Sequence, residues 1–331
     1  MNSFSRPERI VPASNAAAFF PPSWAAADGL VLLPQFALLE VAGSGARAFL
    51  HTQLTSDVKA LGATNAQFSA WCNAQGRMLV NFILHARPAA GGETFCLFMR
   101  ADRLQGILQR LQKYVLRAKV SLTTRSDLGY LGLCGTKLPS LLKTAGFAPP
   151  PEDAMLGVSA QDETTLIRLP DGRCLLAAPQ SLLKEYAERF AAQLPTVDAS
   201  YWQWRDICAA LPWIDNATAE AFVPQMLDFE KTGVSFQKGC YPGQEIIARA
   251  QYLGEVKRHL YRLFASRPML PGEDLYADSE PRQAVGKVIA AAPVPNDPGR
   301  HAALAVLQDA HAHDIAPIQA QRTAYTQHVD S

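Results

Sequence analysis

The sequence predicts an α+β protein with two ferredoxin-like α/β sandwich units and a small C-terminal antiparallel β-barrel. Two parts of the chain alternate between expected strands and helices, which is typical of α+β sandwiches. From Val256 onward the pattern changes to short strands separated by Pro and Gly turns, which favours a small barrel. A chain of 331 residues is also long for one hydrophobic core. We therefore expect a loose lead-in (1–28), two α+β domains (29–126 and 127–254) and the barrel (255–331).

The first α+β domain is expected to contain five strands and two helices. Its apolar, β-rich runs cover residues 30–33, 36–41, 68–72, 78–85 and 94–99. The segment 74–77 between the third and fourth runs predicts a hairpin, and Ser44 is the expected N-cap of the first helix. Apolar residues recur at helical spacing over 102–116, which predicts an amphipathic helix that packs on the sheet.

The second domain and the barrel follow from the same patterns. In the second domain we expect strands at 128–134, 164–169 and 173–178 and helices near 138–145, 181–194 and 201–210. In the barrel we expect strands at 256–265, 274–277, 284–290, 302–307 and 317–322.

Charge and hydropathy argue against two classes of protein. The net charge of +1 gives no electrostatic basis for nucleic-acid binding, so we expect no stable nucleic-acid partner. The apolar runs are far shorter than a membrane span and the N-terminus has no signal-peptide pattern. The sequence thus predicts a cytoplasmic protein without membrane association. A monomer is the expected state, although no sequence pattern determines it.

The cysteines show no metal-binding pattern. The six are Cys72, Cys96, Cys134, Cys174, Cys208 and Cys240. The sequence contains no Cys-x-x-Cys pair and no Cys/His pair at zinc spacing, so we expect neither a metal site nor an iron–sulfur cluster of the chain's own. Reduced thiols are the expected state in the cytosol.

Residues 238–245, Lys-Gly-Cys-Tyr-Pro-Gly-Gln-Glu, carry the strongest chemical signal, and we call them the signature. Pro242 and Gly243 predict the central pair of a type II turn, and helix-forming residues follow. Cys240 is thus expected near a helix N-terminus and beside Lys238, and both features favour the thiolate. The alternative is a tight structural turn whose cysteine is merely small and buried.

The signature resembles the Lys-Gly-Cys-Tyr-x-Gly-Gln-Glu motif of the YgfZ-type folate-binding proteins, which are relatives of the glycine-cleavage T-protein. Other segments are also similar to this family: Phe-Leu-His-Thr-Gln-Leu-Thr-Ser-Asp-Val at 49–58, and 73–77, 211–214, 222–226, 246–249 and 252–254. The resemblance implies a T-protein-like ring, in which three parts of the chain surround a central hole that holds folate.

The resemblance also shows where the chain departs from the T-protein, a tetrahydrofolate-dependent aminomethyltransferase. Asn81 lies where the T-protein has an aspartate close to the reacting folate nitrogens, and an amide cannot act as a carboxylate base. Residues 205–210 resemble a folate-binding Arg-x-Glu-Ala-Gly stretch, with Cys208 at the glutamate position and Asp206 two residues earlier. Ordinary aminomethyltransferase activity is therefore not expected.

A folate pocket needs apolar or aromatic walls and a few polar groups. The expected folate-binding residues are Asn81, Trp71, Trp204, Arg205, Asp206, Cys208, Gln225, Asp228, Tyr241, Gln244 and Arg249; Trp202 and Trp213 are further aromatic candidates. Several have structural alternatives, namely core packing for the tryptophans, a cap for Asp228, a surface ion pair for Arg249 and the first helical turn for Gln244.

The resemblance implies an accessory protein that binds tetrahydrofolate or a one-carbon derivative and supports iron–sulfur cluster assembly or repair on other enzymes. Cys240 is then the reactive group, with Lys238 as the second catalytic candidate. The implied partners are folate and iron–sulfur client or assembly proteins, and tRNA modification would be affected indirectly. Two alternatives remain open: a folate-dependent one-carbon transferase, such as an aminomethyltransferase or demethylase, and a non-catalytic scaffold.

Overall fold

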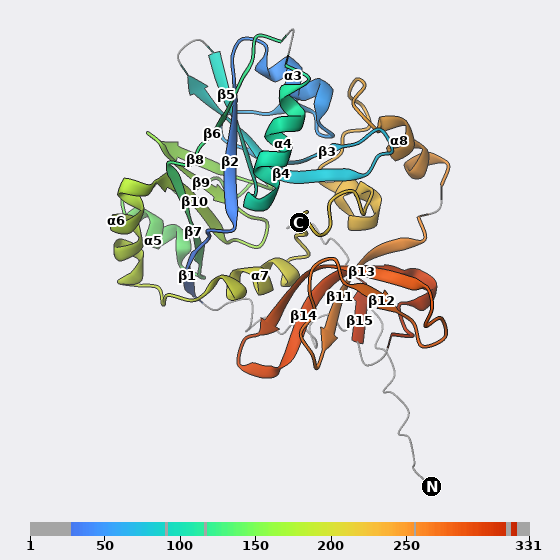
Figure 1. The fold of residues 1–331 in the computed structure, drawn as a ribbon. Helices are drawn as coiled ribbons and strands as arrows, with labels where there is room; N and C mark the ends of the chain where they lie inside the picture. The colour runs from blue at the N-terminus through green and yellow to red at the C-terminus, as the bar shows by residue number, and fades with distance from the viewer. Residues whose placement is uncertain (1–27, 90–91, 116–117, 255, 316–318, 323–331) are drawn as a thin grey trace.

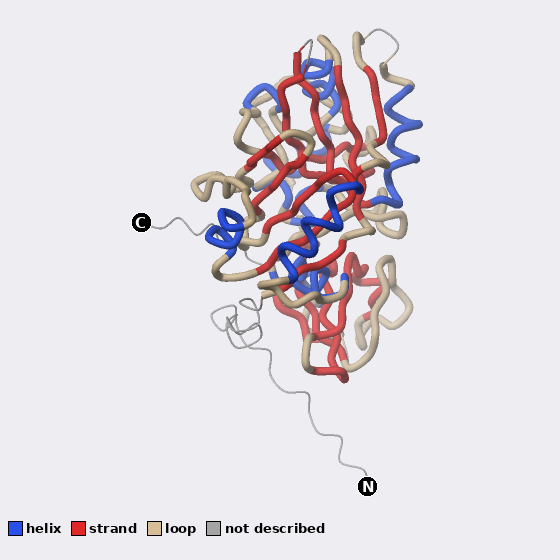
Figure 2. The backbone as a smooth tube through the Cα atoms, turned by 90° about the vertical axis from the view of Figure 1, so that its left-hand side faces the viewer, coloured by secondary structure: helices blue, strands red, loops and turns tan. Residues whose placement is uncertain are grey.

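The computed structural model describes residues 28–89, 92–115, 118–254, 256–315 and 319–322. Within them the chain forms a mixed α/β structure with three five-stranded antiparallel sheets (Figure 1). The third sheet lies below the other two in both views (Figure 1, Figure 2). No helix in these ranges is long and apolar enough to cross a lipid bilayer. Most of the predicted lead-in, residues 1–27, lies outside the described residues.

The first sheet is built from the predicted first domain. Its strands are β2 (Phe36–Ala42), β3 (Ala66–Cys72), β4 (Met78–Ala89), β5 (Gly92–Arg100) and β6 (Ser121–Thr124), in the order β3-β4-β5-β2-β6. Helices α3 (Ala46–Gln53) and α4 (Ala101–Gln112) cover one face, where Trp71 and Phe82 pack with the apolar residues of the helices. The predicted hairpin is confirmed, with Cys72 opposite Met78.

The second sheet contains one strand from the start of the chain. Its strands are β1 (Gly29–Leu32), β7 (Leu128–Cys134), β8 (Val158–Gln161), β9 (Thr164–Arg168) and β10 (Cys174–Pro179), in the order β1-β7-β10-β9-β8. Helices α5 (Leu138–Thr144) and α6 (Gln180–Ala191) cover its outer face. The strand expected at 30–33 therefore pairs with the second domain, not with the first. Four neighbouring strands of the second sheet, β9-β10-β7-β1, correspond to β4-β5-β2-β6 of the first sheet when β1 is treated as the last strand of its unit. Both sets then have the ferredoxin-like strand order.

Three local features differ from the sequence prediction. The first helix begins at Ala46 with Gly45 as its N-cap, so the prediction of Ser44 as the N-cap is wrong. Strands β6 and β8 escape prediction because each has four residues, most of them at least partly exposed, and neither contains an apolar run.

The C-terminal part of the chain forms the third sheet. Its strands are β11 (Arg258–Ala265), β12 (Asp274–Tyr276), β13 (Ala284–Val294), β14 (Asp297–Gln308) and β15 (Gln319–Arg322), in the order β12-β13-β14-β11-β15. Helix α7 (Ala199–Cys208) lies between this sheet and the second one (Figure 1). The five predicted strands are confirmed; closure into a barrel and the ring arrangement stay predictions.

One hydrophobic core joins the three sheets. It contains residues from the inner faces of the first two sheets, such as Phe68 and Tyr130, together with Trp202 of α7 and Leu260 of β11. The segment between α7 and β11 carries the signature and packs against this core. It therefore brings the signature close to groups from distant parts of the sequence.

Candidate functional site

The signature forms the turn that its sequence predicts. Gly243 has φ 80° and ψ 0°, and the Gln244 N–H donates to the Tyr241 carbonyl at 3.2 Å, which confirms the type II turn. Helix α8 (Gln244–Tyr252) begins directly after it. A Cβ atom at Gly243 would lie 2.4 Å from the Asn73 carbonyl oxygen, so only glycine fits. The turn thus packs tightly on the β3–β4 hairpin.

Cys240 is exposed, unlike the other five cysteines, all of which the structure describes. Four of those are buried and Cys208 is half-buried. Burial raises the pKa of the Cys134 thiol to about 11 and that of Cys174 to about 12, which makes them unreactive. The alternative of a small, buried cysteine in the signature is therefore wrong. Cys240 is the thiol that solvent and partners can reach.

Lys238 lies in a buried site and is bonded to backbone groups. Its side chain is buried, and its ammonium donates to the carbonyl oxygens of His51 and Leu54, the latter at 2.5 Å. These carbonyls lie at the C-terminal end of α3, where a cation complements the helix dipole. The ammonium also lies 5.0 Å from the centre of the Tyr241 ring. Burial lowers the Lys238 pKa to about 8.

The segment 49–58 and the chain that precedes the signature are joined through Thr55. The fully buried Thr55 hydroxyl donates to the Gly233 carbonyl at 2.6 Å and accepts from the Ala70 N–H at 2.9 Å. The Thr55 carbonyl accepts from the Ser235 N–H at 2.9 Å. Two family-like segments about 180 residues apart therefore form one unit, and Lys238 belongs to the same connection.

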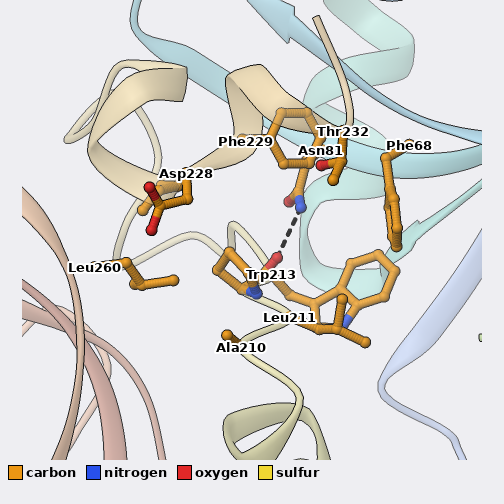
Figure 3. A pocket seen from close by; sticks show the side chains of 11 residues that line it. Phe68, Asn81, Ala210, Leu211, Trp213, Asp228, Phe229, Thr232 and Leu260 are labelled. Carbon is orange, nitrogen blue, oxygen red and sulfur yellow. Dashed lines mark hydrogen bonds between the residues drawn. The ribbon is translucent and has the colours of Figure 1, made fainter. Parts of the chain in front are cut away.

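A pocket lies on the inner face of the first sheet, beside the central core (Figure 3). Its walls come from β3, β4, the chain after α7, two 3-10 turns and β11. They are Phe68, Asn81, Ala210, Leu211, Pro212, Trp213, Leu227, Asp228, Phe229, Thr232 and Leu260. Most of these side chains are apolar or aromatic, and the polar exceptions Asn81, Asp228 and Thr232 come from separate elements. This combination suits a flat, largely apolar ligand with a polar edge.

Asn81 uses both ends of its amide within the protein. Its Nδ2 donates to the Pro212 carbonyl at 2.8 Å, and its Oδ1 accepts from the Ile214 N–H at 2.8 Å (Figure 3 shows the first bond). The side chain is nearly fully buried. A carboxylate here would lack the N–H that the Pro212 carbonyl requires. The amide therefore has a structural reason to replace an aspartate at this position.

Asp228 lies between the two 3-10 turns, η3 (Pro224–Leu227) and η4 (Phe229–Lys231), in the left-handed conformation with φ 54°. The residue lines the pocket, and its carboxylate accepts from the Lys231 ammonium at 2.8 Å. Gln225 on the preceding turn donates to the Ile247 carbonyl of α8 at 2.7 Å. The turn that supplies Leu227 to the pocket wall is thus bonded to the helix after the signature.

The other sequence-predicted residues lie around the pocket rather than in its walls. Trp71 packs on the opposite face of the first sheet, because it is an odd number of residues from Phe68 along β3. Trp204, Arg205, Asp206 and Cys208 all lie on α7; Trp204 is in the central core and Arg205 pairs with Asp171. Tyr241 is buried beside Lys238, whereas Gln244 and the exposed Arg249 belong to α8.

Sequence reasoning missed eight of the eleven residues of the pocket wall, among them Phe68, Phe229 and Thr232. Alternation along β3 is the signal that could have favoured Phe68 over Trp71. No sequence pattern marks the other two, because the fold of the irregular chain before the signature places them there. Among the described residues, no group of three or more His, Cys, Asp or Glu could hold a metal ion.

Comparison with known proteins places this geometry in a family, although no protein-family model matches the chain. The chain is 34% identical over 275 residues to the tRNA-modifying protein YgfZ of Photorhabdus laumondii subsp. laumondii, covering 81% of each chain. It is 34% identical over 268 residues to the protein of the same name from Yersinia enterocolitica, covering 79% of each.

A solved structure shows the same fold. The glycine cleavage system aminomethyltransferase T from Bartonella henselae aligns with a TM-score of 0.69 at 19% identity, over 86% of this chain and 79% of that one. The resemblance seen in the sequence is thereby confirmed, both for the YgfZ-type proteins and for the T-protein fold. On these grounds the chain belongs to the YgfZ family.

Proposed function

We propose that this protein binds tetrahydrofolate or a one-carbon derivative and supports tRNA modification through iron–sulfur enzymes, with Cys240 as its reactive group. The observation that carries the proposal is the exposed Cys240 thiol on a rigidly built signature. The relatives at 34% identity are named as tRNA-modifying proteins. The fold is that of an aminomethyltransferase whose family resemblance implies tetrahydrofolate.

The pocket at Asn81 supports the folate part of the proposal. Phe229, Trp213 and Phe68 supply aromatic surface for a pterin. The Asp228 carboxylate is an acceptor that suits the N–H groups on the pterin edge. Gln225 joins this pocket to α8, which would place the folate in the part of the molecule that also carries the signature.

The net charge of the chain and the proposed role of Cys240 agree with an indirect route to tRNA modification. A net charge of +1 gives little attraction for tRNA. In this proposal a cluster belongs to the client enzyme; among the described residues no group of three or more His, Cys, Asp or Glu could hold a metal ion. Cys240 would then act on the client or on the folate.

The Asn81 geometry argues against the alternative of an aminomethyltransferase. Both ends of the amide are bonded to backbone groups, so the position offers no base to a substrate.

The binding step is tested by calorimetric titration with tetrahydrofolate under reducing conditions. We expect Cys240→Ser to bind as the wild type does, and Asp228→Asn to bind roughly tenfold more weakly, because it loses a charged acceptor. Asp162→Asn is the matched control, since Asp162 also has a positive φ, of 52°, but is exposed on another turn. Absence of binding by the wild type would refute the folate proposal.

The reactive group is tested in cells that lack the endogenous protein. Cys240→Ser should fail to restore the tRNA modifications that depend on iron–sulfur enzymes, whereas Cys174→Ala, which changes a buried thiol behind the second sheet, should restore them. Thermal unfolding of both variants verifies that they fold. Full restoration by Cys240→Ser would show that the thiol is not the reactive group.

A further inference from the structure

A buried carboxylate on α7 joins the pocket to an internal ion cluster. Asp206 is 4% exposed. Its Oδ1 accepts from Arg173 Nη2 at 2.8 Å, and its Oδ2 accepts from the Trp213 indole Nε1 at 3.2 Å. Asp206 is not part of the pocket wall, but Trp213 is. Each oxygen of the carboxylate therefore has a partner inside the protein, and one of these partners faces the ligand site.

The ion cluster gives Asp206 a fixed position. Arg173 is 1% exposed, donates from Nε to Asp171 Oδ2 at 2.6 Å, and lies 4.2 Å from the centre of the Trp202 ring. Arg205 lies 3.3 Å from the same Asp171 oxygen. Two arginines and two aspartates thus balance in charge, and a buried guanidinium restrained on several sides gives the carboxylate little freedom to move.

Trp213 is held at three points. Its ring contacts Phe36 edge-on with centroids 4.9 Å apart and Phe98 with centroids 5.9 Å apart. The bond from its N–H to Asp206 then fixes which edge of the indole faces inward. An aromatic wall that is oriented before binding avoids the entropy cost of ordering it with the ligand.

We propose that Asp206 is a positioning residue that holds Trp213 as a pre-oriented flat wall for an aromatic heterocycle, without touching the ligand itself. This inference rests on the proposed function, since it takes the pocket to be the folate site. The Asp206–Trp213 link can nevertheless be measured without a ligand, so the two ideas can fail separately.

The link is tested by NMR on protein with ¹⁵N-labelled tryptophan. The chain has five tryptophans, and the resonance that disappears in Trp213→Phe is assigned to Trp213. The Asp206→Asn amide has only one acceptor oxygen, so it cannot accept hydrogen bonds from both Arg173 and Trp213 as the carboxylate does. We therefore expect the Trp213 indole N–H resonance to shift and its proton to exchange faster with solvent. An unchanged resonance and exchange rate in the folded variant would overturn the inference.

The effect on the ligand is tested by titrating tetrahydrofolate into wild type, Asp206→Asn, Trp213→Phe and the double variant. Each single variant should bind roughly tenfold more weakly, and the double variant no more weakly than either, because both changes remove the same bond. Fully additive losses would overturn the inference. If Asp206→Asn does not fold, the tetrahydrofolate affinity of Trp213→Phe tests the inference by itself. Wild-type affinity in Trp213→Phe would then also overturn the inference. Absence of binding by the wild type would refute the folate proposal but leave the NMR result valid.

Discussion

The signature and the pocket are built in opposite ways, although Gln225 connects them. The signature is a short continuous segment whose shape follows from local chemistry, and it presents an exposed thiol. The pocket is assembled from the β3–β4 hairpin and three segments distant from it in sequence, and both ends of the Asn81 amide are bonded to the chain's own backbone. The difference suggests a division of roles, in which the pocket recognises a ligand and the signature meets a partner.

The exposed Cys240 of the signature lies between two buried residues. Lys238, two residues earlier, is fixed to the end of α3, and Tyr241, one residue later, is buried beside it. The exposed cysteine is thus carried between two buried anchors. A rigid mount of this kind limits the positions that the thiol can take.

The largest effect is expected from Gly243→Ala, which would break the signature while leaving the pocket residues unchanged. Gly243 has φ +80°, and an added Cβ would lie 2.4 Å from the Asn73 oxygen and 2.7 Å from the Gly76 Cα. Because both contacts are with backbone, we expect a loss of at least about 3 kcal/mol in the free energy of unfolding, measured in urea.

Gly239→Ala is the matched control for this change. No atom lies within 4 Å of the Cβ that would be added there, and Gly239 has no positive φ. Its free energy of unfolding should remain within about 0.5 kcal/mol of the wild type. Equal stability of the two variants would show that the turn does not pack on the hairpin as described.

A smaller effect is expected from Asn81→Asp, which tests the pocket side of the comparison. The change would leave the Pro212 carbonyl without its donor and would bury a charge, so we expect a loss of about 2–4 kcal/mol and no gain of aminomethyltransferase activity. The exposed Asn216 is the control, because its Oδ1 accepts from Arg103 and a carboxylate retains that bond. Aminomethyl transfer by a stable Asn81→Asp variant would support the one-carbon transferase alternative.

These two regions also show what a sequence can and cannot predict. The turn at Gly243 and the helix after it were predictable because the spacing of Pro and Gly determines local backbone conformation. The side-chain partners of Lys238 were not, because the carbonyls of His51 and Leu54 lie more than 180 residues away in sequence. Proximity to Cys240 along the chain suggested activation of the thiol, whereas the fold directs the ammonium to α3.

The same limit applies to the sheets and the pocket. Strand periodicity located most of the strands, but it could not show that β1 completes the second sheet, because strand pairing is a long-range choice. Likewise, the family resemblance led to Asn81 and Asp228, which do line the pocket, whereas the search for aromatic pocket walls led to Trp71, which faces the other side of β3. Residues that share a segment can thus lie on opposite faces of one sheet.

The smallest effect is expected from the pH dependence of the Lys238 anchor. Burial lowers the Lys238 pKa from 10.5 to about 8, so between these values the unfolded chain holds a proton that the folded protein has released. The stability contributed by this group therefore rises with pH through that window, and below about pH 8, where both states hold the proton, it stays at its lowest level. The difference in the free energy of unfolding between wild type and Lys238→Met should grow by about 2 kcal/mol from pH 7 to pH 10, since one pKa unit is about 1.4 kcal/mol.

Urea unfolding of both proteins under reducing conditions at several pH values measures this difference, in which the titration of groups that do not interact with Lys238 cancels. Lys184→Met is the control, because it removes an ammonium from a side chain that is 89% exposed and not from a buried site. A flat difference for Lys238→Met would mean that the ammonium stays charged and hydrated up to its ordinary pKa. The burial of the Lys238 ammonium would then lose its support, and with it one of the two buried anchors on which the contrast between a rigid exposed signature and an enclosed pocket rests.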